Sequence, residues 1–418
     1  MGHTLAEKIL MRNTNGPDIA PGELIIANAD RVMIHDLFAP FVIEKFYEMN
    51  FKKVWDPDKV FIVYDHLVPA STLDDYRHHR AAEAFAAEQG IKNVHRADGV
   101  CHQLMPEQRH VLPGHVVFGT DSHTTTYGAI GAFATGIGYT EMAAILGTGK
   151  LWLKVPATLR FNIEGRLPAG VFSKDIILRI IGDIGADGAT YKAMEFAGAA
   201  ISELSVSSRL TLSNMAVEAG AKAGLMAPDE KTLEFCGLDD AADIRDLKSD
   251  GDASFERVFD YDAAGFEPSV ACPSNVDNTR GVGEVSGIKL DQAFLGSCTN
   301  GRLEDLEIAA QILKGRKVAP FMKFIVTPAS RTVYRDAVEK GIISVFLEAG
   351  AIVTQASCGL CCGRSGGIVS DGERVIASNN RNFLGRMGSS KSEVYLASPA
   401  TVAASAIEGR IADPRKYL

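Results

Sequence analysis

Residues 294–302 read Phe-Leu-Gly-Ser-Cys-Thr-Asn-Gly-Arg, and residues 356–364 read Ala-Ser-Cys-Gly-Leu-Cys-Cys-Gly-Arg. In both stretches the cysteines stand among the small and polar residues that are typical of tight loops. Apolar runs at 290–295 and 351–355 predict strands that end just before these loops. Parallel strands joined by helices bring such loops to the same edge of a sheet. The two stretches therefore predict an α/β fold in which three distant cysteines converge.

Three of these cysteines, Cys298, Cys358 and Cys361, have the character of a metal site. Three thiolates are one ligand short of a closed zinc site or a fully ligated iron–sulfur cluster. A metal with three protein ligands keeps one position for substrate. Ordinary packing and thiol-redox chemistry are the alternatives, but a redox Cys-x-x-Cys pair normally opens a helix after a first strand. The total of seven cysteines is odd and no signal peptide precedes them, so a disulfide framework is disfavoured.

The rest of the chain also predicts strands alternating with helices. Strands are expected at 60–64 and 115–118, and a helix at 73–89. An edge strand at 154–166 is expected to open a second unit, and an Ala-rich helix is expected at 214–224. After 285 the alternation continues, with helices predicted at 303–314 and 330–340 and a strand at 322–326.

The composition excludes several functional classes. The chain has 418 residues, of which 46% are hydrophobic and 23% charged, and its formal net charge is −9. This balance fits a soluble globular protein and disfavours nucleic acid or an anionic membrane as a partner. No apolar run is long enough to span a bilayer, and the N-terminus lacks a targeting pattern, so a cytoplasmic protein is expected.

Ionisable residues stand at predicted strand ends or near glycine in the first part of the chain. They are Asp65-His66, His102 in Gly-Val-Cys-His-Gln, and Asp121-Ser-His123. An Asp–His pair fixes the imidazole tautomer and raises its basicity, which suits acid–base catalysis. For any one of these histidines alone, a hydrogen-bonded loop residue is the favoured explanation.

Two other stretches are less specific. Arg381 and Arg386, in Asn-Asn-Arg-Asn-Phe-Leu-Gly-Arg, have the geometry to bind carboxylates, and surface ion pairs explain them about as well. The glycine-rich segment 128–138 lacks the Gly-x-Gly-x-x-Gly order, so close backbone packing is favoured over dinucleotide binding.

Together these motifs resemble the aconitase superfamily, in particular the large subunits of hydro-lyases of the isopropylmalate isomerase and homoaconitase type. The resemblance runs nearly end to end. It rests on the two cysteine stretches and on several further motifs, among them Val-Tyr-Asp-His-Leu-Val-Pro-Ala, Gly-Val-Cys-His-Gln, Asp-Ser-His-Thr, Asn-Met-Ala-Val-Glu and Asn-Arg-Asn-Phe-Leu-Gly-Arg-Met-Gly. It implies three α/β domains at 1–153, 154–284 and 285–418, with parallel sheets around a central cluster and no swivelling domain.

The resemblance implies one [4Fe–4S] cluster per chain, held by Cys298, Cys358 and Cys361. It also implies Asp–His and Glu–His pairs, with His66 protonating the leaving hydroxyl. The implied catalytic residues are Asp65, His66, His102, Asp121, His123 and Glu218, where Asp65 pairs with His66, Asp121 with His102, and Glu218 with His123. The implied substrate-binding residues are Ser122, Asn214, Asn380, Arg381 and Arg386.

The resemblance also implies a partner, because the serine base of the family lies on a swivelling domain. We therefore expect a small swivel-domain subunit, in a heterodimer or heterotetramer, and a small hydroxy-acid substrate. Isomerisation of isopropylmalate in leucine biosynthesis is the favoured reaction. Homoaconitase, a methylated-malate dehydratase and, more distantly, a non-enzymatic iron-sensing relative are the alternatives. Cys362 and His35 depart from the aconitase pattern, and neither receives a role.

Overall fold

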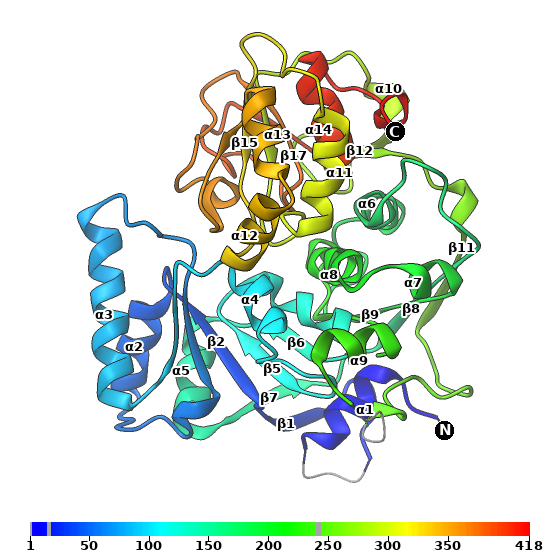
Figure 1. Ribbon diagram of the computed structural model, residues 1–418. Helices are drawn as coiled ribbons and strands as arrows, with labels where there is room; N and C mark the ends of the chain where they lie inside the picture. The colour runs from blue at the N-terminus through cyan, green and yellow to red at the C-terminus, as the bar shows by residue number, and fades with distance from the viewer. Residues whose placement is uncertain (1, 15–17, 240–243) are drawn as a thin grey trace. The chain divides into compact units, whose positions relative to one another are not determined.

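The computed structural model describes residues 2–14, 18–239 and 244–418 (Figure 1). Its contacts group the chain into two compact units. The first comprises Met1–Arg96, Leu104–Glu164 and Ala189–Tyr261, and the second comprises Ala97–Gln103, Gly165–Gly188 and Asp262–Leu418. Within the described residues, no helix is both long enough and apolar enough to cross a membrane. The three-domain division expected from the sequence stays a prediction.

A five-stranded parallel sheet forms the centre of the first unit, in the order β4-β3-β2-β5-β6. Its strands are β2 (Arg31–His35), β3 (Val60–Tyr64), β4 (Asn93–Arg96), β5 (Val116–Gly119) and β6 (Phe133–Gly136). Every residue of β3 and of β5 is buried, as expected for parallel strands covered on both faces. The strands predicted at 60–64 and 115–118 are confirmed.

Helices cover this sheet, and the capping residues of α3 show how local sequence determines where a helix begins and ends. Thr72 accepts a hydrogen bond from the backbone N–H of Asp75, whose side chain accepts one from the backbone N–H of Thr72, and Gly90 ends the helix in the left-handed region at φ 73°. The helix predicted at 73–89 is therefore confirmed. The described helices of this unit are α1 (Leu5–Arg12), α2 (Ala39–Glu48), α3 (Leu73–Gln89), α5 (Tyr139–Thr148), α7 (Ala199–Glu203), α8 (Val206–Met215) and α9 (Glu230–Cys236), and α4 (Cys101–Glu107) has residues in both units.

The first unit also holds a four-stranded sheet, in the order β10-β9-β8-β11, and a two-stranded antiparallel ribbon. The strands of the four-stranded sheet are β8 (Thr158–Glu164), β9 (Ala193–Ala197), β10 (Ala223–Leu225) and β11 (Arg257–Asp262), and those of the ribbon are β1 (Leu24–Asn28) and β7 (Lys150–Lys154). The strand expected at 154–166 is present as β8, but β8 has a neighbour on each side, so its expected position at a sheet edge is wrong. The helix expected at 214–224 is also wrong: α8 ends at Met215, and a 3₁₀ turn follows at Ala216–Ala219.

The second unit is built on a seven-stranded sheet, in the order β13-β12-β18-β17-β14-β15-β16. The pairs from β18 to β16 are parallel, whereas β12 pairs antiparallel with both of its neighbours. The strands are β12 (Ser269–Ala271), β13 (Thr279–Gly281), β14 (Gln292–Leu295), β15 (Lys323–Val326), β16 (Ile352–Val353), β17 (Arg374–Ala377) and β18 (Glu393–Ala397). The strands predicted before both cysteine stretches are present, and the expected α/β class with parallel sheets is confirmed.

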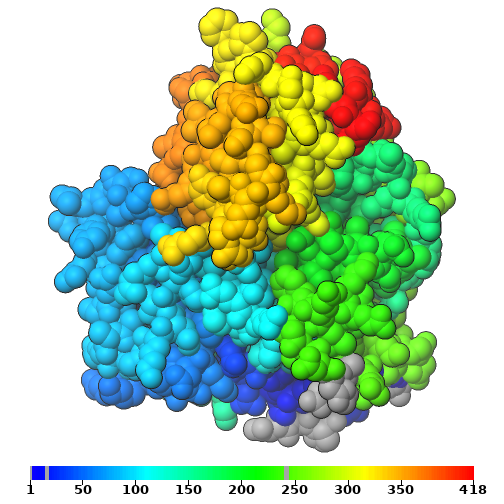
Figure 2. Space-filling view, in the orientation of Figure 1, coloured from blue at the N-terminus to red at the C-terminus, as the bar shows by residue number. Residues whose placement is uncertain are grey.

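Six helices of the second unit lie in the described part of the chain. They are α6 (Ser173–Ile184), α10 (Val282–Val285), α11 (Leu303–Leu313), α12 (Arg331–Glu339), α13 (Ile342–Ala349) and α14 (Pro399–Glu408). In Figure 1, α11, α12 and α13 stand in front of the sheet, and their yellow and orange surface hides the strands in Figure 2. Their apolar faces share one buried core with the strands behind them, which holds the ends of those strands in place.

Candidate active site

The three cysteines of the predicted cluster site, hereafter the cluster cysteines, are Cys298, Cys358 and Cys361. All three are buried. Cys298 follows the end of β14, and Cys358 precedes the 3₁₀ turn Gly359–Cys362, which follows β16. Both strands run parallel in one sheet, so their loops meet at its carboxyl edge, as the sequence predicts.

One amide side chain joins the two cysteine stretches. The Asn380 Nδ2 lies 3.5 Å from Cys298 Sγ, and its Oδ1 lies 3.6 Å from Cys361 Sγ. Asn380 follows β17, which is the strand beside β14. The Arg386 Nη2 donates toward Cys361 Sγ at 3.5 Å. The sequence-predicted residues Asn380 and Arg386 therefore lie directly against the sulfur atoms.

The donor set fits an iron–sulfur cluster. Hydrogen bonds shared with the thiols of Cys361 and Cys362, together with burial, raise the pKa of Cys358 well above its ordinary value. A bound metal ion overcomes this, because it deprotonates a coordinating thiol. Burial alone would lower the pKa of Arg386, but the nearby Cys361 and Cys358 sulfurs raise it. Soft thiolates that receive N–H donors from an amide and a fixed cation are the surroundings that such clusters use.

The tight loop before Cys298 depends on two residues with unusual backbone angles. Gly296 has φ 157° and Ser297 has φ 78°. A Cβ on Gly296 would lie 2.7 Å from the carbonyl oxygen of Thr327, so a side chain does not fit there. The Ser378 hydroxyl accepts from the Gly296 N–H at 3.0 Å. These contacts tie the end of β14 to the end of β17, which carries Asn380.

Two buried cations also contact these loops, Arg302 at the loop of Cys298 and Lys174 at the loop that leads to Asn380, and the sequence reasoning missed both. Arg302 donates from Nη2 to the Cys298 carbonyl oxygen and from Nη1 to that of Thr299, each at 2.6 Å. The Lys174 Nζ donates to the carbonyl oxygens of Ser378, at 3.0 Å, and Asn379. Arg302 ends the first quoted stretch, so its position was visible in the sequence. Lys174 lies on a distant helix, and no motif surrounds it.

A second group of site residues lies in the first unit, where β3 ends. The His66 Nδ1 lies 2.7 Å from Asp65 Oδ1, and both side chains are buried. Asp36, at the end of β2, accepts hydrogen bonds from the backbone N–H groups of His66, at 3.1 Å, and Leu67, at 2.9 Å. Burial alone would raise the pKa of Asp36, but its hydrogen bond to His79 lowers it. Asp36 is a further member of this buried group that the sequence reasoning missed.

The neighbouring loop after β5 holds His123 between two carboxylates. The His123 Nε2 lies 2.7 Å from Glu218 Oε1, and its Nδ1 lies 3.3 Å from Asp121 Oδ1. The backbone N–H of His123 also donates to Asp121 Oδ1 at 2.8 Å. Glu218 comes from the 3₁₀ turn that replaced the expected helix. The sequence-predicted pair of Glu218 and His123 is thus brought together across 95 residues.

The other sequence-predicted residues lie as follows. Ser122 is partly exposed at the start of the 3₁₀ segment Ser122–Ile130, and Asn214 is buried with its Nδ2 donating to Thr126 Oγ1 at 2.8 Å. His102 is buried on α4, and Arg381 is partly buried in the loop after β17. His102 and Asp121 belong to different compact units, and their pairing stays a prediction.

Comparison with known proteins identifies the family. The model of the aconitase family (aconitate hydratase) matches residues 7–286 and 281–409. The chain belongs to the aconitase family. This aconitase-family chain is 50% identical to the 3-isopropylmalate dehydratase large subunit 1 of Methanopyrus kandleri, over 100% of both chains. It is 49% identical to the 3-isopropylmalate dehydratase large subunit of Nitratidesulfovibrio vulgaris, over 99% of both.

The family fold extends to distant structures. The crystal structure of Thermococcus kodakaraensis aconitase X in its holo form matches with a TM-score of 0.50, covering 85% of this chain and 84% of that one. The sequence identity is 9%, so this likeness shows the fold alone. The expected aconitase-type architecture is confirmed.

Proposed function

We propose that this chain is the large subunit of a [4Fe–4S]-dependent hydro-lyase that isomerises isopropylmalate in leucine biosynthesis. The observation that carries the proposal is the identity of about half of all positions, over full length, to relatives named 3-isopropylmalate dehydratase large subunit. The cluster cysteines would hold the cluster, which when bound supplies a Lewis acid for the hydroxyl group and a carboxylate of the substrate.

The histidine of the first unit is suited to proton transfer. Asp65 accepts the Nδ1–H of His66, so the tautomer with a proton on Nδ1 is favoured and Nε2 is the nitrogen that exchanges protons. Asp121 Oδ2 lies 3.6 Å from that Nε2 and stabilises its protonated form. In the proposed reaction, His66 gives this proton to the leaving hydroxyl group.

Arginine side chains would hold the carboxylates of the substrate. Arg386 contacts Cys361 through Nη2, while its buried Nε has no hydrogen-bond partner among the described residues. An unsatisfied guanidinium N–H beside the cluster cysteines is a ready donor for a carboxylate oxygen. Arg381 lies in the same loop and is proposed to bind the second carboxylate.

The catalytic base is proposed to come from a small partner subunit. Removing a carbon-bound proton next to a carboxylate requires a positioned base, such as a serine alkoxide stabilised by amides and cations. Closure of a partner over the cluster cysteines would bring that base and exclude water in one step.

The test is to isolate the tagged chain anaerobically from its host with any short partner and to identify that partner by mass spectrometry. Formation of the unsaturated acid is then followed by absorbance with isopropylmalate, homocitrate and citramalate. We expect turnover of isopropylmalate by the complex and none by the cluster-loaded chain alone. Turnover by the chain alone would refute the two-subunit proposal, and a preference for homocitrate or citramalate would refute the proposed substrate.

A further inference from the structure

His35 is a buried histidine that the proposed reaction does not use. It ends β2 with 1% of its surface exposed. Its ring stacks on that of His66, with 4.3 Å between centroids and 26° between planes. Neither Nδ1 nor Nε2 has a hydrogen-bond partner among the described residues. A buried polar group without a partner costs about 1–3 kcal/mol, so its retention requires a reason.

The ring of His35 is neutral at physiological pH. Burial lowers its pKa to about 4, and the charge of His66 acts in the same direction, while Asp121, Asp65 and Asp36 oppose them only in part. A neutral imidazole offers one nitrogen lone pair, which is the form that binds metal ions. Two of the neighbouring carboxylates, Asp36 and Asp65, are themselves fully buried. Their negative charge favours a cation in this part of the structure.

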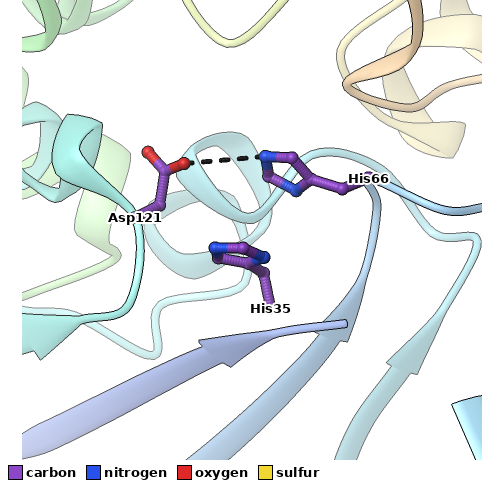
Figure 3. A group of neighbouring side chains, drawn as sticks. All are labelled: His35, His66 and Asp121. Atoms are coloured by element: carbon purple, nitrogen blue, oxygen red, sulfur yellow. Dashed lines mark ion pairs between the residues drawn. The ribbon is translucent and has the colours of Figure 1, made fainter. Parts of the chain in front are cut away.

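His66 and Asp121 face the same space, as Figure 3 shows. Because Asp65 binds the Nδ1 side of His66, the Nε2 lone pair points toward Asp121 Oδ2, 3.6 Å away. This separation is longer than a good hydrogen bond. Zinc–nitrogen and zinc–oxygen bonds of about 2.0–2.2 Å place neighbouring ligand atoms roughly 3.3–3.6 Å apart. The two atoms therefore already have the spacing of ligands to one ion.

We propose that His35, His66 and Asp121 form a binding site for a divalent transition-metal ion, separate from the cluster cysteines. One ligand atom from each residue lies within 4.8 Å of the other two. Two imidazole nitrogens and one carboxylate oxygen select zinc-like or Fe²⁺-like ions over Mg²⁺ and Ca²⁺, which prefer oxygen ligands. Asp65 is the outer carboxylate that orients a metal-binding histidine.

Binding at this site has a consequence for the reaction. A metal ion on the His66 Nε2 occupies the lone pair that accepts and releases the proton. Zn²⁺ would therefore inhibit turnover, with the hydroxyl-protonating group blocked. This consequence rests on the proposed function, whereas the binding itself does not.

The first experiment measures Zn²⁺ binding by titration calorimetry to the cluster-loaded chain, with iron content and visible absorbance followed to verify that the cluster stays intact. The variants are His35→Gln, which removes a ligand, and Asp65→Asn, which removes the outer carboxylate. His110→Gln is the matched control: the pKa of His110 is also lowered to about 4, its Nε2 lies 3.1 Å from His95 Nε2, and neither histidine is one of the proposed ligands.

We expect one strong Zn²⁺ site in the wild type and in His110→Gln. Zn²⁺ affinity should fall at least about tenfold in His35→Gln and about 10–100-fold in Asp65→Asn. Equal affinity in His35→Gln and in the wild type would overturn the proposal. Loss of Zn²⁺ binding in His110→Gln alone would also overturn the proposal, because it would place the ion at His95 and His110.

The second experiment does not depend on any variant folding. Crystals of the cluster-loaded chain are soaked with Zn²⁺, and anomalous diffraction is recorded at the zinc edge. A peak within bonding distance of His35, His66 and Asp121 is the expected result. No peak there, or a peak between Asp36 and Asp65 that leaves His35 uncoordinated, would refute the assignment. If binding is found while isopropylmalate is not a substrate, only the proposed function fails.

Discussion

Replacing Arg302 tests whether buried hydrogen bonds, rather than the cysteines alone, determine the conformation of the loop that carries Cys298. Arg302 is 1% exposed. It donates to the carbonyl oxygens of Cys298 and Thr299, each at 2.6 Å, and to Gln103 Oε1 at 3.1 Å. Arg302→Met keeps the aliphatic volume but removes a donor from three buried acceptors.

The expected destabilisation follows from these contacts. A buried acceptor that loses its donor costs about 1–3 kcal/mol, and loss of one partner from a buried charged group costs about 3–5 kcal/mol in total. Three lost donors sum to more than this range, but contributions within one network are not additive. We therefore expect the second unit to lose about 3–5 kcal/mol of stability.

Hydrogen exchange is the suitable assay, because both tryptophans, Trp55 and Trp152, lie in the first unit. The amides of β14 and β15 should exchange faster by roughly two to three and a half orders of magnitude, since each 1.4 kcal/mol is tenfold. Iron retained after anaerobic reconstitution should fall in parallel. The matched control is Arg410→Met, because Arg410 makes an exposed pair with Glu408 at 3.1 Å and should contribute less than about 1 kcal/mol.

Two outcomes would refute this reasoning. Exchange in Arg302→Met that matches Arg410→Met would show that the three buried hydrogen bonds contribute little to stability. Faster exchange with full iron retention would show that the loop geometry does not control cluster binding.

Three further predictions concern the cluster cysteines and the histidines of the first unit. Serine replacement of any cluster cysteine should abolish iron binding, whereas Cys362→Ser should keep it. The iron content after reconstitution measures this difference, and the reverse pattern would contradict the ligand assignment. Asp65→Asn should lower kcat about 10²–10⁴-fold at unchanged iron content, because it disturbs the tautomer of His66, and near-normal turnover would exclude that role. Burial lowers the pKa of His35 from 6.5 to about 4. As the pH falls, the unfolded chain therefore binds a proton at His35 before the folded protein does. The stability that the folded protein has above pH 6.5 is lost progressively toward pH 4. Between pH 7 and pH 5 the free energy of unfolding of the wild type should fall by about 2 kcal/mol more than that of His35→Gln. Urea unfolding followed through Trp55 measures this difference. Equal decreases would mean that His35 is protonated in the folded protein.

Much of the site was predictable from local sequence. The strands before Cys298 and Cys358 are short apolar runs bounded by Gly, Ser and Asn, and the folded structure keeps the conformation that these local preferences predict. The helix at 73–89 was equally predictable, because its Thr72 cap and Gly90 end are local signals. The pairing of Asp65 with His66 required only adjacent residues at a strand end.

Other features were decided by tertiary contacts. The segment after Asn214 is Ala-rich and reads as a helix, yet it turns at Met215 and places Glu218 against His123. The strand at 158–164 reads as an edge, but β11, nearly a hundred residues later, covers its free side. Pairing partners that are distant in sequence leave no local signal, so local sequence wrongly predicted a helix for the first segment and a sheet edge for the second.

The sequence by itself determined the family and the α/β class, because these follow from ordered motifs, and it predicts the thiol ligand set from the chemistry of the residue types. Only the tertiary structure identified Arg302 as the cation that holds the loop of Cys298, Lys174 as the cation that holds the segment before Asn380, and His35 as a buried imidazole beside His66 and Asp121. Burial and the presence of a hydrogen-bond partner are properties of the packed chain, and they decide the charge and the role of each of these side chains.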